Sequence, residues 1–125
     1  MTKRERIKQK YNGKCAYSGT ELEWDWQIDH IKPVIRDSFC KVPLFKDADT
    51  EANCVPCQKA INQYKHAYEL ETFRGLLMTL HKRIKPTPRT PERIARKKRL
   101  MKVAGYFGIT AEKPFDGIFY FETRR

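Results

Sequence analysis

Long hydrophobic runs are missing from this chain of 125 residues. No apolar stretch approaches the ~20 residues that a membrane-spanning helix needs, so we expect no membrane association. The chain starts with polar residues, Thr2-Lys3-Arg4-Glu5-Arg6, and no secretory signal is expected. Internal repeats are lacking, and the one low-complexity tract is a short Pro-Thr-Pro connector. We therefore expect a cytoplasmic protein, in which disulfide bonds between its four cysteines are disfavoured.

Acidic residues are scarce too, because 15 Asp and Glu face 26 Lys and Arg, a formal net charge of +11. Residues 82–102 hold ten bases and one acid, and residues 3–14 hold six bases and one acid. Residues 15–81 between them carry seven bases and ten acids. Two basic flanks around a mildly acidic middle are typical of a protein whose flanks bind a polyphosphate and whose middle segment carries out a separate chemical function. Solvated helix faces are the alternative, but two basic runs favour a nucleic acid.

The length allows one domain, 1–125, with a real hydrophobic core. Hydrophobic residues make up 40% and charged residues 33%, a globular balance. The residues that we expect in the core are Trp24, Trp26, Leu76, Leu80, Phe107, Ile118, Phe119 and Phe121.

Local signals predict the first half of an α+β fold. Thr2 and Glu5 form a capping box that starts a helix over 2–12, and Gly13 stops it. A tight turn follows at 15–20, and residues 24–29 then alternate between apolar and polar, as in a half-buried strand. Residues 31–50 contain Pro33 and Pro43 and are expected to form a long loop. A short return strand is predicted over 53–56.

The second half is predicted to be mainly helical. From Cys57 to Lys85 the chain has few helix breakers, and apolar residues at intervals of three or four predict a buried stripe of Leu70, Phe73, Leu77, Leu80 and Ile84. After a stiff connector at 85–89, a basic helix is expected from the Thr90 cap and Pro91 to about Ala104, closed by Gly105. Asp116-Gly117 is expected to turn the chain into a short C-terminal strand over 118–122.

Three short pieces matter together: Cys15-Ala16-Tyr17-Ser18-Gly19, Asp29-His30-Ile31-Lys32-Pro33, and Asn53 with Asn62 and Lys65. A neutral imidazole at His30 can take a proton from water near working pH. Asp29 and Asn62 offer carboxylate and amide oxygens, which suit Mg²⁺ or Mn²⁺. Neighbours on a regular strand point to opposite faces, so the strand must end or distort for Asp29 and His30 to face one metal.

In these pieces the chain resembles the His-Asn-His (HNH) endonucleases, whose core is the ββα-metal (His-Me finger) fold. The small stand-alone members common in phage genomes are similar, as is the HNH domain of RNA-guided CRISPR effectors. The resemblance is strongest over residues 11–74, and residues 113–122 are similar to the tail of some phage members. It implies an endonuclease that hydrolyses DNA with one divalent cation, in a ββα core at about 14–67 with basic helical flanks at 2–12 and 82–104. A phage-encoded protein that acts in the host cell is one expectation from it.

The resemblance also implies roles for single residues. His30 would activate water, Asp29 and Asn62 would bind the metal, and Asn53 would hold the loop that carries His30. Lys65 would contact a phosphate. His66 is a further candidate metal ligand, and its alternative is an exposed polar helix residue. The basic residues that we expect on DNA are Lys59, Lys65, Arg93, Arg96, Lys97, Lys98 and Arg99.

The chain departs from the family at a zinc site. Many relatives carry two Cys-x-x-Cys pairs, but the first pair here is Cys15 and Ser18, and the second is expected at Gln58 and Ile61. Three of four ligands are thus missing, so structural zinc is not expected. A displaced site could use Cys15, Cys40, Cys54 and Cys57. Otherwise these are free thiols, and apolar packing around Trp24, Trp26 and Ile61 takes the place of the metal.

Two other functions remain open from the sequence. One is a non-catalytic DNA- or RNA-binding module on the same scaffold, which the basic flanks support equally well. The other is a zinc-stapled regulator, which the four cysteines support.

Overall fold

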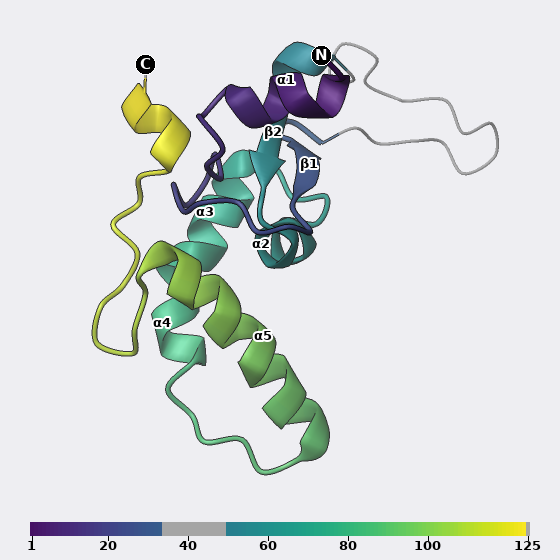
Figure 1. Cartoon of the computed structure of the whole chain (residues 1–125). Helices are drawn as coiled ribbons and strands as arrows, with labels where there is room; N and C mark the ends of the chain where they lie inside the picture. Colours follow the sequence, from purple (N-terminus) through teal and green to yellow (C-terminus); the bar gives the residue numbers. More distant parts are fainter. Residues whose placement is uncertain (34–49, 125) are drawn as a thin grey trace, which may run out of the picture.

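A computed structural model of the chain describes residues 1–33 and 50–124 (Figure 1). Helices and a two-stranded sheet make up its regular structure, so the fold is mixed α and β, as predicted. Most of the loop expected at 31–50, and Cys40 with it, lie outside the described residues. No helix of the described part is long and apolar enough to cross a membrane. The elements are α1 (Lys3–Gln9), β1 (Gln27–His30), η2 (Glu51–Asn53), β2 (Cys54–Cys57), α2 (Lys59–Lys65), α3 (Leu70–Met78), α4 (Leu80–Arg83), α5 (Pro91–Phe107) and η3 (Tyr120–Arg124).

The first helix, α1, begins as the sequence predicts. The Thr2 hydroxyl accepts a hydrogen bond from the Glu5 amide at 3.1 Å, and the Glu5 carboxylate accepts one from the Thr2 amide at 3.2 Å. This capping box satisfies two amides at the helix start. Ile7 is fully buried and packs with Trp26 and Cys54 in a small cluster beside β2. α1 is thereby held against the sheet.

The sheet is a short antiparallel pair that places both predicted strands side by side. β1 and β2 align Asp29 with Val55 and His30 with Cys54. α2 follows β2 after one residue and contacts both β1 and α5. The predicted strand over 24–29 begins later than expected, because the Trp26 amide bonds to the Glu23 carbonyl at 3.2 Å and closes a turn. Trp24, expected in the core, is therefore 92% exposed, whereas Trp26 is buried.

The helical stretch after Cys57 is interrupted, which corrects the single helix expected up to Lys85. α2 ends at Lys65, because His66 adopts φ 50° and ψ −129° and leaves the helical path. The predicted stripe is confirmed on α3, α4 and the residue that follows: Phe73, Leu77, Leu80 and Ile84 are buried and Leu70 is half-buried. This stripe packs with Tyr17, Leu100 and Phe119 into the main core.

The basic helix α5 starts where predicted but ends later. The Thr90 hydroxyl accepts a hydrogen bond from the Arg93 amide at 3.2 Å, and Pro91 takes the first helical position. Gly105 lies inside the helix and does not close it. The end is at Gly108, whose left-handed φ of 69° lets its amide bond back to Ala104 and Gly105.

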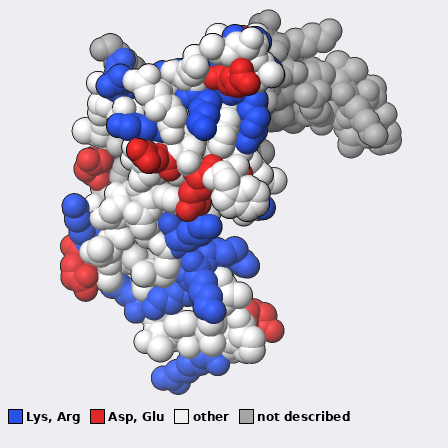
Figure 2. Space-filling view, in the orientation of Figure 1, with Lys and Arg blue, Asp and Glu red and all other residues white. Residues whose placement is uncertain are grey.

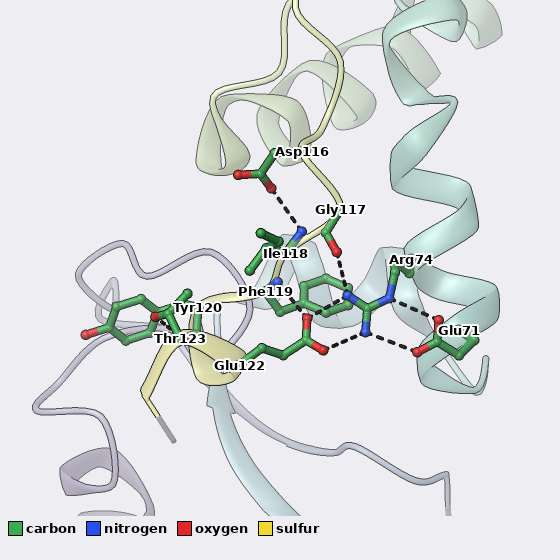
Figure 3. A network of polar contacts seen from close by, with 9 residues as sticks. All are labelled: Glu71, Arg74, Asp116, Gly117, Ile118, Phe119, Tyr120, Glu122 and Thr123. Carbon is green, nitrogen blue, oxygen red and sulfur yellow. Dashed lines mark hydrogen bonds and ion pairs between the residues drawn. The ribbon is translucent and has the colours of Figure 1, made fainter.

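The C-terminal strand predicted over 118–122 is wrong, because Tyr120–Arg124 form a short 3-10 helix, η3. Figure 3 shows the contacts that curl this segment: the Glu122 carboxylate accepts hydrogen bonds from the Phe119 amide at 2.9 Å and from the Arg74 guanidinium at 2.6 and 2.8 Å. Phe119 is fully buried under Arg74, whereas Ile118, expected in the core, is 55% exposed. The amides of Tyr120 and Phe121 bond to the carbonyls of Tyr17 and Ala16, so the tail supports the 15–20 turn.

Candidate active site

The end of β1 and the C-terminal half of α2 border an open hollow of about 470 Å³. The side chains that line it include Asp29, His30, Asn62 and His66. Asp29 and His30 are more than thirty positions before Asn62 in the chain, and the pairing of β1 with β2 and the start of α2 next to it bring them together. β1 ends at His30, as expected if both Asp29 and His30 are to face one hollow.

The Asp29 carboxylate is buried and held by two donors. Its Oδ2 accepts a hydrogen bond from the Tyr17 hydroxyl at 2.6 Å and lies 3.2 Å from the Lys65 ammonium. Lys65 is itself fully buried and also donates to the His30 carbonyl at 2.9 Å. The structure therefore corrects our expectation that Lys65 contacts a phosphate, because its charge is directed inward to Asp29.

Tyr17 is a site residue to which the sequence reasoning gave no role. Its ring packs edge-on against Phe73 and Phe119 at centroid distances of 5.5 and 5.4 Å, which fixes the hydroxyl under Asp29. Burial, followed by the charge of Asp29 and the hydrogen bond to it, holds the pKa of Tyr17 well above its usual value. The hydroxyl therefore keeps its proton and acts as a donor. The sequence signal that could have identified Tyr17 as a site residue was its place inside the 15–19 motif.

Asn53 holds the turn after His30, in agreement with its predicted role. Its Oδ1 accepts from the Lys32 amide at 3.0 Å, and its Nδ2 donates to the Lys32 carbonyl at 2.8 Å. The Asn53 carbonyl accepts a third bond from the Ile31 amide at 3.1 Å. These bonds set the direction in which the chain leaves β1, and with it the position of His30.

Asn62 is oriented by a residue of β1. Its Nδ2 donates to Gln27 Oε1 at 2.7 Å, so its Oδ1 is the atom that can bind a cation in the hollow. Our expectation that one helix face presents Asn62, Lys65 and His66 together is met in part. His66 is exposed and lines the hollow with Asn62, but from the residue just beyond α2, and Lys65 points into the core.

The cysteines are divided between two sides of the sheet. Cys15 and Cys57 are buried in the main core, and Cys54 lies in the small cluster with Ile7 and Trp26. Burial would raise the pKa of Cys15, but hydrogen bonds from Cys57 and Ser18 outweigh it and lower the pKa to about 6. Burial holds the pKa of Cys57 well above its usual value. The geometry thus separates Cys54 from Cys57, as expected for residues three apart on a strand.

Gln58 stands where the second zinc pair was expected, and its side chain bonds to the neighbouring segment, 20–23. Its fully buried amide donates to Thr20 Oγ1 at 3.1 Å and to the Glu21 carbonyl at 2.7 Å, and accepts from the Glu23 amide at 3.0 Å. Trp26 and Ile61 are buried as expected, but the exposed Trp24 contributes no packing here. The link between the turn and the start of α2 is therefore polar.

The basic residues expected on DNA fall into different places. Lys59, Arg96 and Arg99 line a groove between α2 and α5, together with Lys102, which we did not predict. Arg93, Arg96 and Lys97 line a second groove with Lys82 and Arg83. Lys98 is exposed and lines neither groove. Figure 2 shows Lys and Arg gathered over the lower half of this face, where α5 lies.

Within residues 1–33 and 50–124, no three His, Cys, Asp or Glu side chains form a metal-binding group. Asp29 and Asn62 offer one carboxylate and one amide oxygen to a cation, and His66, the further candidate ligand, lines the same hollow. No family model matches the chain, and comparisons with curated proteins and with solved structures find no significant match.

Proposed function

We propose that the protein is a metal-dependent endonuclease that hydrolyses DNA phosphodiester bonds, with a ββα-metal core formed by β1, β2 and α2. The observation that carries this proposal is the shared hollow of Asp29, His30 and Asn62. A carboxylate, an imidazole and an amide from separate elements supply the ligands and the base that phosphodiester hydrolysis needs. The basic groove that adjoins the hollow at Gln63, and the second basic groove next to it, suit a polyanionic substrate.

The residues present fit a hard divalent cation such as Mg²⁺ or Mn²⁺. Asp29 Oδ2 is engaged by Tyr17 and Lys65, and its Oδ1 is the oxygen that could bind a cation. Asn62 Oδ1 offers a second oxygen, since the amide nitrogen donates to Gln27. Mg²⁺ is commonly held by one or two protein oxygens and keeps several waters. When bound, the cation supplies charge neutralisation at the phosphate and at the departing 3′ oxygen.

The protein's own residues perform the proton transfer and the positioning. His30 takes the proton from the attacking water. Asn53 fixes the turn that follows His30, and so helps to place the backbone that carries the imidazole. Tyr17 and Lys65 orient the Asp29 carboxylate toward the hollow.

One observation favours a second function, a non-catalytic nucleic-acid-binding module. The buried ammonium of Lys65 lies 3.2 Å from Asp29 and already neutralises the carboxylate that a cation would need. If this ion pair excludes the cation, the protein can still bind a nucleic acid through its basic grooves but cannot cleave it with a metal. Metal binding therefore separates the two functions.

A plasmid-nicking assay tests the proposal. Supercoiled DNA is incubated with the protein in Mg²⁺, Mn²⁺ or EDTA, and the conversion to nicked circles is followed on a gel. We expect cleavage with either metal and none with EDTA. Asn62→Ala should raise the Mg²⁺ concentration required for half-maximal rate, whereas His81→Gln on α4, outside the hollow, should not. DNA binding without cleavage in any divalent metal would favour the binding module instead.

A further inference from the structure

The larger basic groove, between α2 and α5, has a volume of about 620 Å³. Four bases line it, Lys59 from α2 and Arg96, Arg99 and Lys102 from α5, against one acid, Asp25. Tyr64, Leu100 and Val103 add apolar surface to its wall. Such a groove combines phosphate-binding charge with room for flat apolar groups.

This groove adjoins the candidate active site. Gln63 lines both the groove and the hollow that contains Asp29, His30 and Asn62. The two depressions therefore meet at one residue of α2. A polynucleotide strand with one phosphate in the hollow could place the neighbouring phosphates among the bases of the groove.

Trp24 stands beside this groove on an anchored turn. It is 92% exposed and directly precedes Asp25, which lines the groove. The preceding residue, Glu23, is tied to both sides: its amide donates to Gln58 Oε1 at 3.0 Å, and its carboxylate accepts a hydrogen bond from the Tyr106 hydroxyl of α5. A single exposed apolar side chain is ordinary on a protein surface. An exposed indole on a turn that is anchored next to a basic groove is a different case, because the turn holds the backbone that carries a flat ring close to the bases of the groove.

We infer that this groove and Trp24 together bind a single-stranded segment of nucleic acid, with the bases of the groove on its phosphates and the indole stacked on one nucleobase. Sites for single strands combine a positively charged groove with aromatic rings on which bases stack. A base inside a duplex exposes no ring face unless it is unstacked, so the indole selects for single strands or for distorted duplexes. The inference names the substrate of the proposed nuclease and in that respect rests on it.

Tryptophan fluorescence tests the stacking directly, because the chain has only two tryptophans. Trp26 is buried under the Arg4 guanidinium, 3.8 Å from the ring centroid, and Trp26→Phe leaves Trp24 as the sole reporter. This variant is titrated with a short oligothymidylate in EDTA, where no cleavage occurs. We expect saturable quenching of Trp24. In the otherwise wild-type chain, Trp24→Ala should weaken oligonucleotide binding by about 5- to 150-fold.

The salt dependence of binding tests the groove. Arg96→Gln and Arg99→Gln should each reduce the slope of log Kd against log salt by about 0.7, the value for one phosphate contact on a single strand. Lys98→Gln is the matched control, since Lys98 is an exposed base of the same helix that lines neither groove. Circular dichroism verifies that each variant is folded.

The outcomes separate this inference from the proposed nuclease function. Unquenched Trp24 fluorescence at saturating oligonucleotide, with unchanged affinity in Trp24→Ala, would overturn the stacking. Tighter binding to an intact duplex than to the single strand would overturn the substrate class. If Trp24 is quenched and the salt slopes change as stated but no metal supports cleavage, the inference holds and the nuclease proposal fails.

Discussion

Replacing Lys65 by Met removes the positive partner of a buried ion pair. The Lys65 side chain is 1% exposed and that of Asp29 is 9% exposed, and the two charged groups are 3.2 Å apart. Methionine has a similar length and no charge, so the Asp29 carboxylate keeps the hydrogen bond from the Tyr17 hydroxyl but loses its positive partner. It also deprives the His30 carbonyl of the hydrogen bond from Lys65.

Removing one partner of a buried pair costs about 3–5 kcal/mol, because the remaining charge stays desolvated without compensation. Lys65→Met should therefore lower the free energy of unfolding by about that amount. A domain is stable by only about 5–15 kcal/mol, so the loss is large. The double variant Lys65→Met with Asp29→Asn also neutralises Asp29. It should regain a substantial part of the lost free energy of unfolding, because no isolated charge remains.

Urea denaturation of the wild type, both single variants and the double variant measures the coupling between the two side chains. The control is Lys59→Met on the same helix, where the side chain is exposed and a change within about 0.5 kcal/mol is expected. A loss below about 1 kcal/mol in Lys65→Met, or strict additivity in the double variant, would refute a buried, coupled pair. The nicking assay on the same variants would show whether Lys65 also supports activity through Asp29.

Three further substitutions test other contacts of the site. Tyr17→Phe keeps the ring packing but removes the hydrogen bond to Asp29, and urea denaturation should show a loss of about 1.5–3 kcal/mol. Asn53→Ala removes two hydrogen bonds to Lys32, and it should cost about 1–3 kcal/mol in denaturation and slow nicking more than it weakens DNA binding. His66→Gly relieves the backbone at φ 50° and should raise the unfolding free energy by about 1 kcal/mol. Lower nicking activity in that variant would identify His66 as functional, and lower stability would contradict the strain.

Features with a local chemical cause were predictable from the sequence. The capping box at Thr2 and Glu5 and the Thr90-Pro91 helix start depend on residues within one helical turn, and both are confirmed. The buried stripe of α3 and α4 follows from helical periodicity alone. The position of Asn53 against the turn after His30 follows from the resemblance, and its hydrogen bonds agree with the predicted role.

Features that depend on distant partners were not predictable. Periodicity places Lys65 on the same helix face as Asn62, but the nearby Asp29 carboxylate draws its charge into the core. The β-propensity of residues 118–121 favours a strand, but the contacts of Glu122 with Arg74 and with the Phe119 amide curl the segment into η3. α2 ends at His66, and no glycine or proline at that position signals the helix end in the sequence. In each case a tertiary contact or a backbone angle outweighs the local preference.

The nicking rate of His30→Ala in Mg²⁺, compared with that of the wild type, tests the central claim most directly. Loss of a general base predicts a decrease of about 10²- to 10⁴-fold in rate, with DNA binding in EDTA unchanged. Equal rates for the two proteins would show that the imidazole of His30 does not activate the water, and the assignment of this hollow as an active site would fail.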